Sequence, residues 1–331
     1  MLGEACALAA ALTWSISVIL FACAEAELRS ATPLASRDPR PGASRPNGDL
    51  AIKRSEAASP VAMALFKNVV ALVLLVLTLL ALGEPLLATG RSRDDWVRLC
   101  VSGILGVAVC DTLVFMALRR LGASLLAVVD CAYAPTTVLL SVVVLGEPLG
   151  GGFGLGAALV VGGVLAVAAE PAPSAPDQEH DPQGRAVGVV LGLIGIVAMA
   201  IGVVLAKPAL AQGHLVEVTA VRMAAGVAAQ LLWVALRPGR AETLRVFVHR
   251  DVWPTLLPAS VLGTYVAMLF WLGGFKWAPV SVASVLNQLA SAFTVLLAWL
   301  VLREPLTPRR ALGTAAAVGG AALVLAGRAA G

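Results

Sequence analysis

The sequences LGEPL at residues 145–149 and LREPL at residues 302–306 lie 157 positions apart. At the same offset, residues 96–169 align without a gap with residues 253–326, and the matches include Trp, Glu, Pro and paired Gly. A fixed offset over about seventy residues is hard to obtain by chance, even in a chain rich in Leu, Val and Ala. The chain is therefore an internal duplication.

The composition is that of a membrane protein. Hydrophobic residues make up 59% of the chain, charged residues make up 13%, and the mean hydropathy is +0.89, whereas about a quarter of the residues in soluble domains are charged. Ten unbroken apolar runs begin near residues 3, 61, 97, 122, 149, 186, 216, 254, 279 and 308. A helix of roughly 20 such residues crosses a hydrocarbon core about 30 Å thick, and the runs lack the alternation of barrel strands. The predicted fold class is an all-α membrane protein with ten transmembrane helices.

Five spans in each copy have a consequence for topology. An odd number of spans makes the second copy enter the membrane from the opposite side, so the halves are predicted to be inverted repeats, as in many secondary transporters. The predicted boundaries are residues 1–169 for the first repeat, 170–185 for a linker rich in Pro and acid, and 186–331 for the second repeat. Residues 25–60, rich in Ser, Pro, Gly and charge, are predicted to form a disordered loop.

The sequence predicts neither a cofactor nor a metal site. The cysteines lie inside predicted spans without paired spacing, so they are interpreted as packing residues: Cys6, Cys23, Cys100, Cys110 and Cys131. The three histidines lie in loops or at span ends. No phosphate-binding loop or dinucleotide fingerprint is present. The predicted partners are a small-molecule substrate, the lipid bilayer and protons, but not nucleic acid, and the protein is expected to be a monomer or a homodimer.

Two long stretches carry the duplicated pattern, namely GVAVCDTLVFMALRRLGASLLAVVDCAYAPTTVLLSVVVLGEPLGGGFGLGAALVVGGVLAV at residues 106–167 and LREPLTPRRALGTAAAVGGAALV at residues 302–324. Both resemble the EamA-type module of the drug/metabolite transporter superfamily. The resemblance implies ten helices in a basket, movement of small metabolites and cytoplasmic termini, but no particular substrate. The sequence departs from the family pattern in the long insert at 25–60 and in Lys67, where the module often has Arg.

The orientation in the membrane is left open. Most Lys and Arg residues outside the spans lie in loops that follow odd-numbered spans. The positive-inside rule would then place the termini outside, whereas the resemblance implies that both are cytoplasmic.

Four charged residues lie deep inside predicted spans: Asp111, Asp130, Lys67 and Arg222. A deep charge costs at least roughly 2.5–3.5 kcal/mol on insertion scales, so each is a candidate for a functional site. Asp111 and Asp130 flank a predicted turn near Leu121, and a rise of 1.5 Å per residue puts both at about 14 Å from that surface. Lys67 enters from the same surface and can reach this layer with its flexible stem.

A lysine between two carboxylates would hold at least one of them ionised while the other exchanges a proton, as a proton-coupled carrier requires. The alternative is a static buried ion network that only fixes helix packing. At the 157-residue offset, Met268 aligns with Asp111 and Asn287 aligns with Asp130, so the second copy lacks both acids. Arg222 is either a grip for a substrate carboxylate or phosphate or a partner of one of the two acids across the repeats.

Polar and aromatic residues complete the candidate substrate and proton pathway. Amide groups are offered by Asn287, Gln288 and Asn68, and aromatic residues that either line the same cavity or serve packing are Trp14, Tyr133, Tyr265 and Trp271. Small residues permit close helix contact and are interpreted as scaffold packing, with homodimerisation as the alternative. They are the glycines at 150, 152, 154, 156, 162 and 163, with Gly154, Ala158 and Gly162 as one such face, and Gly313, Ala317 and Ala321 in the last helix. Glu147 and Glu304 are expected at turns on opposite faces, where each caps a helix.

The predicted function is that of a secondary transporter and not an enzyme. It is predicted to move small metabolites or amphipathic compounds across the cytoplasmic membrane by proton-coupled export. The alternatives are a passive facilitator or sensor, in which the charged layer never changes protonation, and an intramembrane enzyme that acts on lipid-linked substrates. The enzyme alternative lacks a His or metal constellation.

Overall fold

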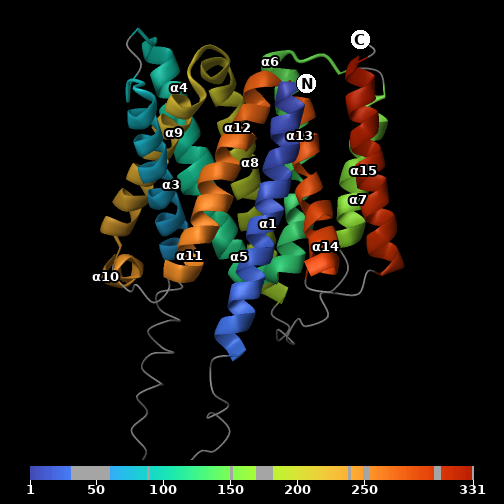
Figure 1. The fold of residues 1–331 in the computed structure, drawn as a ribbon, viewed down its shortest axis with the longest axis horizontal. Helices are drawn as coiled ribbons and strands as arrows, with labels where there is room; N and C mark the ends of the chain where they lie inside the picture. The colour runs from blue at the N-terminus through green and yellow to red at the C-terminus, as the bar shows by residue number, and fades with distance from the viewer. Residues whose placement is uncertain are drawn as a thin grey trace, which may run out of the picture.

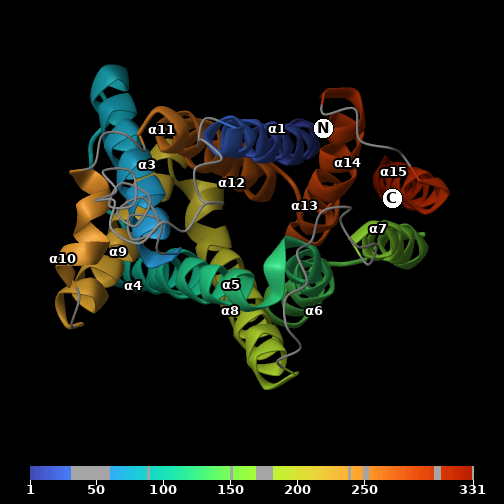
Figure 2. The same ribbon diagram turned by 90° about the horizontal axis from the view of Figure 1, so that it is seen from below.

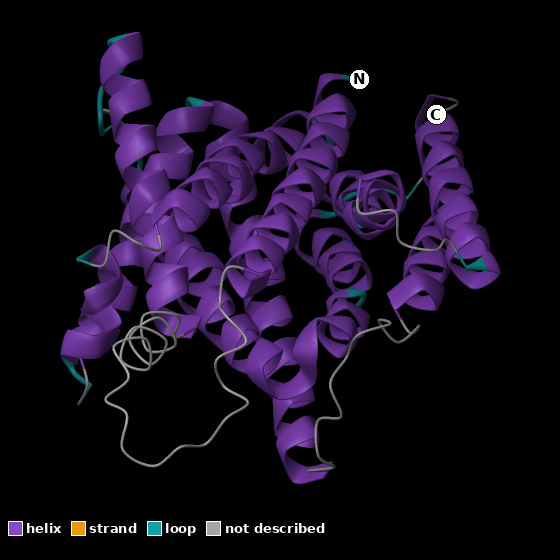
Figure 3. Ribbon diagram, turned by 60° about the horizontal axis from the view of Figure 1, so that its bottom comes forward, coloured by secondary structure: helices purple, strands orange, loops and turns teal. Residues whose placement is uncertain are grey.

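The computed structural model describes residues 1–30, 60–87, 90–149, 152–168, 182–237, 240–248, 253–301 and 307–329. Within these residues every regular element is a helix (Figure 3), so the predicted all-α class is confirmed. Most of the expected loop at 25–60 and of the expected linker at 170–185 lies outside the described residues. Helix α1 extends to Ser30, and α8 begins at Pro182, so both helices run into the predicted connections.

The helices follow one another along the chain with short interruptions: α1 (Leu2–Ser30), α3 (Pro60–Leu82), α4 (Arg93–Gly103), η1 (Ile104–Val109), α5 (Cys110–Asp130), α6 (Tyr133–Leu145), α7 (Phe153–Ala168), α8 (Pro182–Gln212), α9 (Leu215–Ala235), α10 (Arg240–Leu244), η2 (Arg245–Phe247), α11 (Trp253–Ser260), η4 (Val261–Val266), α12 (Ala267–Trp277), α13 (Val280–Asn287), α14 (Leu289–Val301) and α15 (Pro308–Ala329). Some of these elements follow one another without a break and form longer helices. They are α4, η1 and α5, and likewise α11, η4 and α12.

Among the described residues, six helices have the length and apolar character to cross a membrane: Val61–Leu82, Arg93–Leu118, Gln183–Gln212, Leu215–Ala235, Leu256–Trp277 and Val280–Val301. Four further apolar helices are shorter: Leu2–Ser17, Tyr133–Leu145, Phe153–Ala166 and Ala311–Ala326. The chain is therefore a multi-pass membrane protein, as its composition predicts.

Helix α5 folds back on itself near the turn predicted at Leu121. A Cβ atom added to Gly192 of α8 would lie 3.0 Å from Val129 Cγ1 and 3.6 Å from Ala117 Cβ. In a straight helix these two residues would be about 18 Å apart along the axis. The chain therefore reverses between them, which brings Asp111 and Asp130 toward each other.

Helical irregularities recur at the repeat offset. The π-helical segments η1 (Ile104–Val109) and η4 (Val261–Val266) lie 157 positions apart. The interruption at Cys131–Ala132, between α5 and α6, corresponds to the one at Gln288, between α13 and α14. Pro135 lacks the backbone N–H that would bond to the carbonyl of Cys131, which accounts for the first interruption. The duplication thus extends to the places where the helices deviate from regular geometry, and π-helical turns are frequent at functional sites.

The arrangement in space intermixes the two copies. Both termini lie at the same end of the bundle, at the top of Figure 1. The α6–α7 connection lies at this end too, whereas α14 ends and α15 begins at the opposite end (Figure 1). Helix α1 packs on α12 and α14 from the second copy, and α8 packs on α5 from the first. Residues from both copies therefore surround the centre of the bundle.

Helices α7 and α15 lie side by side at one edge (Figure 2). A Cβ atom on Gly156 would lie 2.8 Å from Gly320 O, so only glycine permits this approach. A Cβ atom on Gly154 or Gly162 would meet nothing within 4 Å. The close-contact face of α7 therefore contains Gly156 and Gly163, two of the predicted glycines, and a Cβ atom on Gly163 would clash with Gly313 O of α15. Gly154 and Gly162 do not belong to it, because the face is rotated around the helix from the one that they form.

Candidate functional site

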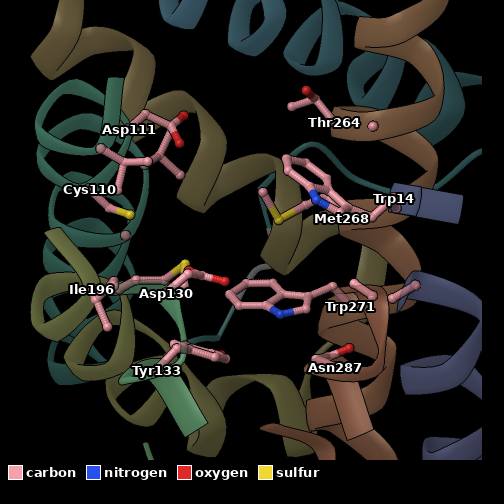
Figure 4. A pocket seen from close by; sticks show the side chains of 18 of the residues that line it. Trp14, Cys110, Asp111, Asp130, Tyr133, Ile196, Thr264, Met268, Trp271 and Asn287 are labelled. Carbon is pink, nitrogen blue, oxygen red and sulfur yellow. The ribbon is translucent and has the colours of Figure 1, made fainter. Parts of the chain in front are cut away.

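A cavity of about 250 Å³ lies inside the bundle, with walls from both copies. Figure 4 shows Asp111 and Asp130 on one wall and Trp271 and Asn287 on the wall opposite. All the candidate pathway residues except Asn68 line it: Asp111, Asp130, Lys67, Arg222, Asn287, Gln288 and Tyr133. Residues that lie far apart in the sequence thus converge on one space.

Asp111 is held by a lysine and an amide from α3. Lys67 Nζ lies 2.8 Å from Asp111 Oδ2, and Asn68 Nδ2 donates to the same oxygen at 2.8 Å. Asn68 is fully buried behind Asp111 and also donates to Gln230 Oε1 of α9 at 3.1 Å. Sequence reasoning missed Gln230, although a buried amide inside a span is the same signal that identified Asn287.

Asp130 has a different environment. Its side chain is exposed to the cavity and extends toward the indole of Trp271 (Figure 4). Among the described residues it makes no ion pair, since Lys67 pairs with Asp111 alone. The expectation that Lys67 lies between two carboxylates was therefore wrong, because the fold brings only Asp111 within reach of its ammonium group. The backbone carbonyl of Asp130 accepts a hydrogen bond from Gln288 Nε2 at 3.1 Å.

Arg222 is a buried cation that lines the cavity. Its residue is only 2% exposed. Its Nε donates to Ser102 Oγ at 2.7 Å, and Ser102 Oγ in turn donates to the carbonyl of Gly202. The guanidinium carbon lies 6.0 Å from the centre of the Trp271 ring. Sequence reasoning missed Ser102, because a single serine in an apolar span gives no sign of its partner on another helix.

No acid pairs with Arg222 within the described part of the chain. Glu217, the acid nearest in sequence, instead forms a bidentate pair with Arg91, with N–O distances of 2.7 and 2.6 Å. The alternative in which Arg222 pairs with Asp111 or Asp130 is not the arrangement observed. Ser102 holds the cation in place, and no carboxylate of the described residues pairs with it.

The remaining lining residues add polar and aromatic groups. Both side-chain amide atoms of Asn287 are buried without a hydrogen-bond partner among the described residues. Trp14 and Trp271 line the cavity, as one interpretation predicted. Tyr265 does not line it, and its hydroxyl lies 2.5 Å from Thr78 Oγ1 instead. The cavity therefore combines an acid, a cation and an amide that have no ion-pair or side-chain hydrogen-bond partner of opposite character in the described part of the chain, apart from the Arg222 bond to Ser102, with an aromatic wall.

No metal site accompanies these groups. Within the described residues, no group of His, Cys, Asp and Glu side chains has an arrangement that could hold a metal ion. The described cysteines Cys6, Cys100, Cys110 and Cys131 are unbridged.

Comparison with known proteins identifies the group to which this architecture belongs. The sequence profile of the EamA-like transporter family matches residues 49–169 and 186–326, so it matches each copy separately and covers most of the chain. The chain belongs to the EamA-like transporter family. This family is part of the drug/metabolite transporter superfamily, and its members are membrane transporters.

One solved crystal structure, whose description names no function, has the same fold as this EamA-like chain. The superposition gives a TM-score of 0.69 at 19% sequence identity and covers 98% of this chain and 97% of the other. At this identity the likeness concerns the fold alone. No curated protein matches the sequence.

Proposed function

We propose that this EamA-like protein is a secondary carrier that exports a small polar metabolite or an amphipathic compound across the cytoplasmic membrane in exchange for protons. In this proposal the ten apolar helices are ten spans, arranged as two inverted repeats of residues 1–169 and 186–331 that are joined by residues 170–185. Support comes from the placement of α6–α7 and α14–α15, whose connecting ends lie at opposite ends of the bundle. A carrier with this architecture exposes a central site to each face in turn.

Asp130 is the proposed proton-exchanging group, and its unpaired carboxylate is the observation on which the proposal depends most. Asp111 is tied to Lys67 and Asn68 at 2.8 Å, so a change in its charge would leave the lysine uncompensated. Asp130 faces the cavity without a cationic partner among the described residues. It can therefore gain or lose a proton without breaking an ion pair.

Arg222 is the proposed anchor for an acidic group of the substrate. The hydrogen bond from Nε to Ser102 orients the guanidinium plane, and the terminal nitrogens can bind a carboxylate or phosphate in a bidentate manner. The aromatic wall of Trp14 and Trp271 would contact the apolar part of the compound. These groups account for a substrate that is small and either polar or amphipathic.

A transport screen tests the proposal. Purified protein is reconstituted in proteoliposomes that contain a pH-sensitive dye, and radiolabelled small metabolites and amphipathic compounds are added one at a time. The expected result is movement of one compound together with a change in dye signal. Movement without a dye response would indicate a passive facilitator, and absence of movement for every compound would contradict the carrier function.

A further inference from the structure

Glu147 follows α6 in the sequence but caps α13 of the other copy. Its Oε1 accepts a hydrogen bond from Val280 N at 2.7 Å, and its Oε2 accepts from Ser281 N at 3.0 Å and from Ser281 Oγ at 2.9 Å. Pro279 stands at the N-cap position and supplies no side-chain acceptor. The carboxylate therefore satisfies backbone N–H groups that the helix itself leaves unpaired, and its charge suits the helix N-terminus.

Two lysines cap the C-terminal ends of neighbouring helices. Lys207 of α8 donates to carbonyl oxygens at the end of α12, at 2.5 and 2.7 Å. Lys276 of α12 donates to carbonyl oxygens at the end of α8, at 2.6 Å each. These two caps join α8 to α12 within the second copy, and Lys207 also interacts electrostatically with Glu147. The Glu147 contact differs from them because it joins α6 to α13 across the copies.

The boundary between α6 and α13 runs from this contact down to the cavity. The two helices pack against each other, and α13 is buried from Val280 to Leu286. At the lower end of the boundary, Tyr133 of α6 and Asn287 of α13 line the cavity. The upper end lies at the face that carries both termini, where α6 ends (Figure 1). The α6–α13 boundary is thus a direct route between that face and the cavity.

Hydroxyl side chains lie on both helices but do not bond across this boundary. Thr137 and Ser141 are buried on α6 and donate to carbonyls of their own helix. Ser284 is buried on α13 and donates to Ser281 O. Within the described residues, two sets of hydrogen bonds therefore cross this boundary. Glu147 bonds to the start of α13 at the face of the termini, and Gln288 bonds to the carbonyl of Asp130 at the cavity. Hydroxyls bonded in this way can also bind water, so separation of the helices would not break the hydrogen bonds of Thr137, Ser141 and Ser284.

We propose that the α6–α13 boundary is a polar access pathway to the cavity, and that Glu147 is the contact that closes it at the face of the termini. The inference rests on the proposed carrier function, which requires access to the cavity from each face in turn. Release of α13 by Glu147 opens the pathway toward Asn287, and recapture closes it.

The chain contains a matched control for Glu147. The pentapeptide LGEPL occurs at residues 82–86 as well as at 145–149. In both copies of the pentapeptide the glycine ends a helix in a left-handed conformation, with φ of 67° at Gly83 and 65° at Gly146. Both turns lie at the face of the termini (Figure 1). The Glu84 side chain is exposed and makes no hydrogen bond or ion pair with another described residue, while its backbone N–H bonds to Leu79 O at 3.0 Å, so Glu84→Gln changes the same charge without touching α13.

Thiol labelling tests the pathway. The native cysteines are replaced, Ser284→Cys is introduced, and a membrane-impermeant maleimide is added to the face of the termini, which is located by a terminal tag. The assay contains neither substrate nor pH gradient. Glu147→Gln is expected to raise the labelling rate about ten-fold, because a charge-assisted hydrogen bond is replaced by weaker neutral ones. Ser281→Ala is expected to raise it by a smaller factor, and Glu84→Gln is expected to leave it unchanged.

Two outcomes overturn the proposal: an unchanged rate in Glu147→Gln, or an equal rise in Glu84→Gln. Size-exclusion chromatography of each variant first establishes that it is folded, so that a rise in rate reports the boundary and not unfolding. An unchanged labelling rate in Glu147→Gln would contradict the proposed pathway but would not bear on the proposed carrier function. Loss of the carrier function would instead appear in the proteoliposome screen of the unmodified protein.

Discussion

Gln288 Nε2 donates a hydrogen bond to the backbone carbonyl oxygen of Asp130, 3.1 Å away. Gln288 is the residue at which the helix of the second copy is interrupted, and Asp130 immediately precedes the corresponding interruption in the first copy. The bond therefore ties the two interruptions together at the cavity. It holds the backbone of Asp130 in place while its carboxylate faces the open space, as suits a group that changes charge during a cycle.

Replacement of Asp130 by Asn is expected to abolish pH-driven transport while leaving expression and pH-independent substrate exchange largely intact. The amide cannot exchange a proton, yet its shape is already accommodated by Asn287 at the aligned position of the second copy. Transport in proteoliposomes with and without a pH gradient measures both quantities. Unchanged proton coupling in Asp130→Asn would falsify the proposed role of Asp130.

Asp111→Asn is expected to act on stability. The change leaves Lys67 without its anionic partner and weakens a hydrogen bond to a charged group, which is worth about 1.5–3 kcal/mol. Thermal unfolding in detergent should therefore begin at a lower temperature than in Asp130→Asn. If Asp130→Asn is instead the variant that fails to fold, Asp130 has a structural role and not the proposed role in proton exchange.

Replacement of Arg222 by Lys is expected to raise the KM for transport about ten-fold to a hundred-fold, since lysine keeps the charge but loses the fork that binds a carboxylate or phosphate in a bidentate manner. Initial rates over a range of substrate concentrations measure this effect. Ser102→Ala removes the partner of Nε and should raise KM less. A KM that is unaffected in Arg222→Lys would show that the substrate does not bind this side chain as a bidentate ligand.

The Arg91–Glu217 pair is expected to contribute to stability and not to transport. Both side chains are nearly buried, at 7% and 3% exposure, and removal of one partner from a buried pair costs about 3–5 kcal/mol. Glu217→Leu should therefore lower the unfolding temperature, and Arg91→Met should restore part of this loss when it is combined with Glu217→Leu. Strictly additive losses in the double variant would contradict this, as judged by thermal unfolding of all variants.

The distribution of Lys and Arg predicts that the end of the bundle opposite the termini faces the cytoplasm. In a cysteine-free background, Ser92→Cys near the face of the termini should then react with an impermeant thiol reagent added outside cells, and Ala241→Cys at the start of α10 should not. The reverse pattern would support cytoplasmic termini, as the family resemblance implies. Glu304, which was expected at a turn on the face opposite Glu147, lies outside the described residues.

How far the sequence predicted the site can be judged from individual residues. The cost of a charge or amide in a span identified Asp111, Asp130, Lys67, Arg222, Asn287 and Gln288, all of which line the cavity. The same rule applied to Gln230 would have identified the amide behind Asn68. The rule locates polar groups but does not assign their partners, and for this reason Lys67 was expected between two acids although it pairs with Asp111 alone.

The sequence by itself determined the membrane class, the duplication and the charged residues that line the cavity. Insertion depends on the apolar content of each run of roughly 20 residues, and this is a local property that can be read along the chain. Only the tertiary structure decided which groups meet: Asp111 with Lys67, Glu217 with Arg91, Tyr265 with Thr78, and Glu147 with the start of α13. A buried polar group pairs with whatever group packing brings within about 3 Å, and that depends on the mutual placement of helices that are far apart in the sequence.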